Sequence, residues 1–179
     1  MASIVQQRFF TSTNGSGLVQ DLPFASAVTP GSTILCIMFV TEDVTAVNVN
    51  GMAGSPAATN DYTQALAVNT ARVWRYTNAD ASATGFRVTT ATSHLDINGW
   101  IVEVSGLAAS SPFTAGATFP DDFGAVELDA TASVSAAGDA AFAYFKDVPL
   151  ANITSTRSGF TQSPASTGTD LLQTNMNSG

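Results

Sequence analysis

The segment TILCIMFV, residues 33–40, constrains the fold of this chain more than any other stretch. The run is short, almost wholly apolar and rich in β-branched and aromatic residues, and a turn at Pro30-Gly31 precedes it. A membrane-spanning helix needs about 18 or more apolar residues, and a buried helix of a soluble protein is also longer than this run. The run therefore predicts a central β-strand that is buried on both faces.

Several more short apolar segments follow, separated by Gly, Asn, Asp and Pro. In the first of them the dipeptide Asn50-Gly51 predicts a tight hairpin turn, because both residues tolerate a positive φ. Regularly spaced short strands with such turns indicate an all-β fold, an antiparallel β-sandwich of the jelly-roll or immunoglobulin-like type. The expected strands lie in 44–52, in 61–80, where two strands join near Asn69, in 85–92 and in 97–107.

The strand predicted in 97–107 alternates between two faces. Trp100, Val102 and Val104 share one face, and Ile101, Glu103 and Ser105 share the other. Glu103 is the only charged residue within this alternation. We expect it to face solvent or to lie at an edge, because charges are rarely buried unless they are paired. Burial against an arginine such as Arg75 is the alternative.

The length of 179 residues fits one domain. We expect a single β-sandwich over residues 1–179, with an N-terminal arm at about 1–17 and a C-terminal tail at about 161–179. The connection 108–125 contains two prolines, and loops of this length are usually functional or ordered by a partner.

Two C-terminal segments carry weaker signals. Residues 135–147 repeat the order of features around the first strand, a small-residue turn, an apolar run and then an acid, which predicts a corresponding strand. Residues 170–177 could form one or two helical turns at most.

Charge excludes several classes of partner. Only 11% of the residues are charged, against about 25% in an average protein, and the net charge is -8. A nucleic-acid-binding protein neutralises phosphates with clustered Lys and Arg, so we expect no nucleic-acid partner and no anionic membrane surface. The start of the chain lacks a secretory signal pattern, which predicts synthesis in the cytoplasm. The six cations are Arg8, Arg72, Arg75, Arg87, Lys146 and Arg157.

The residues that catalysis and metal binding require are scarce. The single histidine, His94, is expected in an exposed turn, and no G-x-S-x-G nucleophile motif is present. One His and one Cys are too few for a zinc site, and Cys36 is expected to be a small buried apolar residue. We therefore expect no enzyme, no cofactor and no metal.

Acidic and aromatic residues leave two alternatives open. The adjacent pairs Glu42/Asp43 and Asp121/Asp122 are interpreted as solvated turn acids, with a calcium site as the alternative. Trp74, Tyr76 and Trp100 could bind a sugar, although filling the core is the commoner role of Trp in a strand.

Part of the chain resembles a known module. The resemblance covers somewhat under half of the chain, from the first strand to the closing segment VEVSGL, residues 102–107. It is to a β-sandwich module common in virion proteins of tailed phages and in related bacterial surface proteins. The similar segments are 31–40, 44–50, 72–78, 85–90 and 100–107.

The resemblance implies a non-enzymatic virion component. We expect a capsid decoration (cement) protein on the particle surface that binds identical subunits and the major capsid protein and stabilises subunit seams. The alternative is a tail or fibre protein that binds a host receptor such as a glycan. Strand pairing by SIVQQRFF, residues 3–10, and the loop 108–125 are the expected contacts. The interface candidates are Phe9, Phe10, Phe113, Phe119 and Phe123.

Overall fold

The computed structural model describes residues 2–15, 18–65, 70–92 and 95–107, together with three strands within 140–176. Every regular element in these ranges is a β-strand, and all pairings are antiparallel. The predicted all-β sandwich is confirmed. The candidates Phe113, Phe119 and Phe123, as well as His94, lie outside the described residues.

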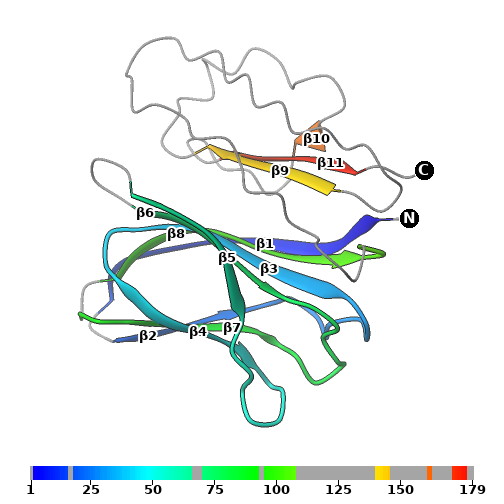
Figure 1. Cartoon of the computed structure of the whole chain (residues 1–179), viewed down its shortest axis with the longest axis horizontal. Coiled ribbons are helices and arrows are strands. Elements are labelled where there is room, and N and C mark those ends of the chain that lie inside the picture. The colour runs from blue at the N-terminus through cyan, green and yellow to red at the C-terminus, as the bar shows by residue number, and fades with distance from the viewer. Residues whose placement is uncertain are drawn as a thin grey trace.

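The larger layer of the sandwich is a five-stranded sheet with β3 at its centre (Figure 1). The long apolar run forms β3, as the sequence predicts, and β3 has hydrogen-bonded neighbours on both sides. In spatial order the strands are β1 (Ser3–Gly15), β8 (Leu95–Ser105), β3 (Thr33–Val40), β6 (Thr70–Tyr76) and β5 (Thr59–Ala65).

The smaller layer is a three-stranded sheet that covers one face of the larger sheet. Its order is β2 (Val19–Pro23), β7 (Gly85–Thr90) and β4 (Val44–Asn50). The apolar residues between the two sheets form the inner core, in which Phe86 and Val88 of β7 meet alternate residues of β3. The inner core includes Leu22, Phe24, Val28, Ile34, Cys36, Met38, Val40, Val47, Val49, Phe86, Val88, Ile97 and Ile101.

The opposite face of the five-stranded sheet carries a second apolar cluster, which we call the outer cluster. Successive residues of a strand point to opposite faces, so Ile34 and Cys36 enter the inner core while Leu35 and Ile37 lie in the outer cluster. The prediction that this strand is buried on both faces is confirmed. The outer cluster consists of Leu35, Ile37, Trp100, Val102 and Val104.

A third, small sheet has the order β10 (Thr161–Gln162), β11 (Leu171–Met176) and β9 (Ala140–Phe145). β9 lies within the predicted strand 135–147, and 170–177, for which the sequence allowed at most one or two helical turns, contains a strand instead. β11 pairs with β9 at six register positions, and this ladder satisfies backbone groups that an isolated short helix cannot hold stably. Figure 1 shows the third sheet on the side of the five-stranded sheet that faces away from the three-stranded sheet.

The turn after β4 also differs from the prediction. Gly51 has a φ of 86°, as a turn glycine should, but the strands do not meet in a tight hairpin. The chain instead forms a longer loop, closed by hydrogen bonds of 2.8 Å from Val49 N to Pro56 O and from Ala58 N to Val47 O. The reason is that β4 and β5 belong to different sheets, so the connection has to cross the sandwich.

Candidate interaction surface

β1 and β2 form neighbouring free edges of the two sheets. Among the described strands, β1 pairs only with β8 and β2 only with β7. Arg8 Nη1 on β1 donates a hydrogen bond of 2.8 Å to Pro23 O on β2, so the two edges lie side by side. β1 has 13 residues and extends roughly 40 Å at about 3.3 Å per residue. An edge of this length offers many unpaired backbone groups to a partner strand.

Three exposed apolar side chains lie on this double edge, Val5 toward one end and Leu18 and Val19 toward the other. Val5 is 46% exposed, and Leu18 and Val19 are each 49% exposed. Within the described ranges, no other large apolar side chain is as exposed as these three. Sheet edges are usually protected by charged residues, but Arg8 is the only charge in β1 and is turned toward β2. The register with β8 shifts between Ile4 and Gln6 and between Ser12 and Gly15, and such irregularities also protect an edge. The regular open part of β1 is therefore Gln6 to Ser12.

A groove of about 250 Å³ runs between the two edges. Arg8, Phe10 and Thr11 of β1 line it together with Gln20 and Leu22 of β2. Sites for drug-sized ligands usually measure about 300–1,000 Å³ and enclose most of the ligand. The size of this groove suits side chains of a bound segment better than an enclosed small molecule.

Phe9 and Phe10 fasten β1 to its own sheet. The ring of Phe9 lies 5.2 Å from that of Trp100, tilted by 56°, and Phe9 packs against the outer cluster. Phe10 packs against the inner core and lies opposite Gly99 in the pairing with β8. An aromatic ring over a glycine covers backbone that would otherwise be open to solvent. Both side chains are partly buried, so much of their apolar surface is used within the sandwich.

Gln6 ties β1 to the loop between β2 and β3. Its Nε2 donates to Glu103 Oε2 at 2.6 Å and to Ser26 O at 3.1 Å. Its Oε1 accepts hydrogen bonds from Ser26 N at 3.2 Å and from Ser26 Oγ at 3.0 Å. This amide therefore connects the edge strand, the loop and β8.

Glu103 corrects the sequence prediction. Its exposed fraction is 0%, so it neither faces solvent nor lies at an open edge. Arg75 is not its partner either, because that guanidinium binds Asp61, with Nε–Oδ2 at 2.8 Å and Nη2–Oδ1 at 3.1 Å. Neutral donors hold the Glu103 carboxylate instead: Gln6, and Thr29 N at 2.7 Å from Oε1.

These hydrogen bonds lower the pKa of Glu103. Burial by itself raises the pKa of a carboxyl group, because it penalises the charged form. The hydrogen bonds from Gln6 and Thr29 outweigh that effect and hold the pKa of Glu103 below its ordinary value. The carboxylate is therefore ionised in the folded protein at neutral pH.

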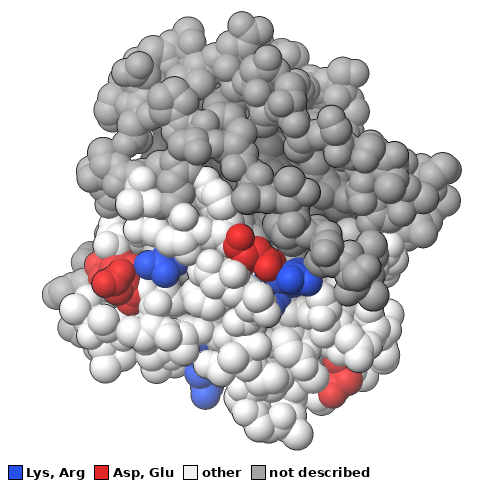
Figure 2. Space-filling model, viewed as in Figure 1, with Lys and Arg blue, Asp and Glu red and all other residues white. Residues whose placement is uncertain are grey.

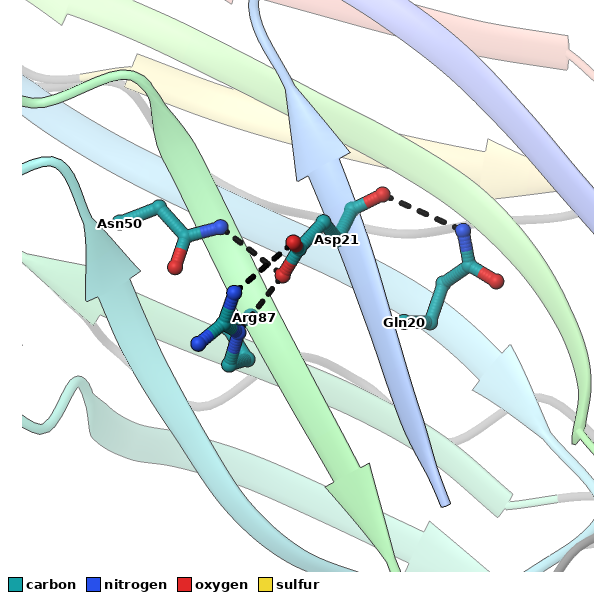
Figure 3. A network of polar contacts seen from close by, with 4 residues as sticks. All are labelled: Gln20, Asp21, Asn50 and Arg87. Atoms are coloured by element: carbon teal, nitrogen blue, oxygen red, sulfur yellow. Dashed lines mark hydrogen bonds and ion pairs between the residues drawn. The ribbon is translucent and has the colours of Figure 1, made fainter. Parts of the chain in front are cut away.

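A polar network crosses the solvent-facing side of the three-stranded sheet (Figure 3). Arg87 on β7 holds Asp21 on β2 in a two-bond ion pair, with Nε–Oδ1 at 2.7 Å and Nη2–Oδ2 at 2.9 Å. Asn50 on β4 donates to Asp21 Oδ1 at 2.9 Å. The hydrogen bonds from Arg87 and then Asn50 lower the pKa of Asp21 to about 2. Both charged side chains are about half exposed, so solvent screens the attraction between them and the pair adds little stability.

Elsewhere among the described residues, the charged side chains form small separate groups. Figure 2 shows no broad area of one sign among the described residues of the face it presents. Within the described part of the chain, no three His, Cys, Asp or Glu side chains come together as a metal site. No helix there is long and apolar enough to cross a membrane.

The aromatic residues considered for sugar binding lie in or against the cores. Trp100 is completely buried in the outer cluster. Trp74 and Tyr76 on β6 are partly buried against the inner core. Their placement follows the commoner role of strand aromatics, which is to fill a core.

Sequence reasoning missed that the edge strands of the two sheets lie side by side. The signal available was the apolar start of both segments around Val5 and Val19, but a sequence does not show that β1 and β2 end up in different sheets.

Comparisons with protein-family models, with curated proteins and with solved structures find no match to this chain.

Proposed function

We propose that this chain is a non-enzymatic structural protein of a phage virion, a capsid decoration protein that binds the head surface and stabilises the seams between subunits. The observation that carries the proposal is the open double edge formed by β1 and β2, which exposes Val5 toward one end and Leu18 and Val19 toward the other. The resemblance of the strand segments to virion modules is the reason for proposing a phage particle as the partner.

The double edge would bind by strand addition. A partner segment pairs its backbone with the outer side of β1, and its side chains enter the groove beside Phe10 and Leu22. Main-chain hydrogen bonds supply affinity, whereas the groove selects the side chains that fit. The partners we propose are the major capsid protein and identical subunits of this chain.

A low charge content suits this role. With 11% charged residues, the surface is dominated by hydroxyl, amide and small apolar groups, so packing against a neighbour desolvates few ions. Each contact needs only modest strength, because subunits held on one particle bind their neighbours at high effective concentration.

Lysines on the double edge test the proposal. We expect Val5→Lys with Val19→Lys to abolish saturable co-sedimentation with phage heads that lack the protein, because a charge on each edge strand opposes pairing. Both side chains are about half exposed, so the fold should persist, which circular dichroism and thermal unfolding will check. The matched control is Thr59→Lys with Thr63→Lys, exposed positions on β5 at the opposite edge of the same sheet.

Wild-type occupancy of heads by the edge variant would rule out the double edge as the binding surface. A parallel variant, Phe119→Asp with Phe123→Asp, measures the contribution of the loop 108–125. Binding of the wild-type protein to tails or host cells, but not to heads, would replace the decoration role by the tail or fibre role.

A further inference from the structure

The outer cluster is more deeply buried than one sheet can explain. Leu35, Trp100, Val102 and Val104 each have an exposed fraction of 0%. Their described apolar neighbours, Ile4, Phe9, Val73 and Leu107, flank the cluster. Side chains on the face of a single sheet leave their outer ends open to water, so complete burial requires a further layer about 10 Å above the sheet.

The third sheet lies where that layer is needed. Figure 1 shows β9, β10 and β11 on the outer side of the five-stranded sheet, away from β2, β4 and β7. The chain also leaves the sandwich on this side. β8 ends at Ser105, and Leu107, which follows it, packs against the outer cluster.

The register of the third sheet distinguishes its two faces. Directly opposed residues of paired strands share a face, so the pairs Ala140↔Met176, Phe142↔Thr174 and Tyr144↔Leu172 lie on one face. The other face carries Ala141↔Asn175, Ala143↔Gln173 and Phe145↔Leu171. The first face is the more apolar, because its polar positions are limited to a threonine and the hydroxyl of a tyrosine.

We propose that the third sheet docks on the outer cluster through the face that carries Phe142, Tyr144, Leu172 and Met176. The five-stranded sheet is then the middle layer of three, with the inner core on one side and the outer cluster on the other. This inference is independent of the virion role. It also closes the outer face to other proteins, so that sheet edges are the surfaces left for strand addition.

The fluorescence of Trp100 tests the docking in the full chain. In a Trp74→Phe background Trp100 is the only tryptophan, and we expect it to be shielded from acrylamide. Phe142→Asp with Tyr144→Asp should increase its quenching severalfold and shift its emission to the red. The matched control is Ala141→Asp with Ala143→Asp, on the opposite face of the same strand, which should leave Trp100 shielded.

Cys36 reports on the rest of the sandwich in the same samples. Its thiol is completely buried in the inner core, so it stays unreactive as long as the two main sheets remain together. An exposed Trp100 with an unreactive Cys36 would support the docking. A shielded Trp100 in the 142/144 variant, or equal exposure in the 141/143 control, would overturn it.

A milder variant covers the case in which the aspartates unfold the whole chain and Cys36 reacts. Phe142→Ala with Tyr144→Ala removes apolar contact without adding charge. Increased quenching of Trp100 with Cys36 still unreactive is the expected result, and unchanged quenching contradicts the proposal.

Discussion

Glu103 shows how one residue can contradict a sound rule about charges. A carboxylate in an apolar strand is expected to face water or to find an arginine, yet this one is buried and held by Gln6 and by the backbone of Thr29. Charge-assisted hydrogen bonds are about twice as strong as neutral ones, which offsets the cost of burial. Glu103 thereby joins β8, β1 and the loop before β3.

Glu103→Gln should destabilise the protein in a pH-dependent way. At pH 7 we expect a loss of about 1–3 kcal/mol in the free energy of unfolding. The glutamine side chain has one oxygen and one NH₂ group, so either Gln6 Nε2 or Thr29 N would face an NH₂ group and lose its acceptor. The folded-state pKa of Glu103 is lowered, so its stabilisation is fully present above the unfolded pKa of about 4.3 and is lost as pH falls through the folded pKa. Urea unfolding at pH 7 and pH 3 measures the difference.

Glu42→Gln is the control for that experiment. Glu42 lies in the turn after β3 and bonds only to the neighbouring Thr41 among the described contacts. Its substitution should change stability by no more than about 0.5 kcal/mol. An equal loss for Glu103→Gln at both pH values would show that the carboxylate charge contributes nothing.

At the scale of the element, β8 depends on a glycine. A Cβ added at Gly99 would lie 2.1 Å from Ile37 O and 3.0 Å from the ring of Phe10. The close approach lets β8 pair with β3 on one side and receive Phe10 of β1 on the other. Gly99 is therefore the position at which both neighbours of the strand limit side-chain size.

Gly99→Ala should cost about 1–3 kcal/mol of stability, because backbone and not a flexible side chain has to move. Ser105→Ala, at the half-buried end of the same strand, should cost only about 0.5–1 kcal/mol, because it removes the hydrogen bond to Ser3 Oγ. Chemical denaturation of both variants checks this, and a neutral Gly99→Ala would mean that the two strands can separate without cost.

At the scale of the whole molecule, the inner core should open only when the sandwich unfolds. Cys36 lies at its centre between the two main sheets, and burial raises the pKa of its thiol, which keeps it protonated and unreactive. We expect a thiol reagent to modify Cys36 at the rate of global unfolding, measured across a series of urea concentrations. Rapid modification in the absence of urea would reveal a local opening of β3.

Much of this architecture follows from local patterns. The run 33–40 predicts a central strand, and the alternation around Trp100 predicts two distinct faces, because side chains of a strand point alternately to either side. Both are confirmed. Local patterns do not predict the structure of 170–177. This segment has a weak helical pattern, but it forms a strand because it pairs with β9, about 30 residues earlier in the sequence.

The sequence by itself thus determined the all-β class, the two-faced central strand and the scarcity of catalytic residues. Only the tertiary structure decided which edges meet, that Gln6 and Thr29 reach Glu103, and that Arg87 reaches Asp21 rather than another acid. The physical reason is range. Strand formation responds to the alternation of neighbouring residues, whereas a hydrogen-bond partner depends on how the sheets bring distant segments together, as with Gln6 and Glu103, which are 97 residues apart.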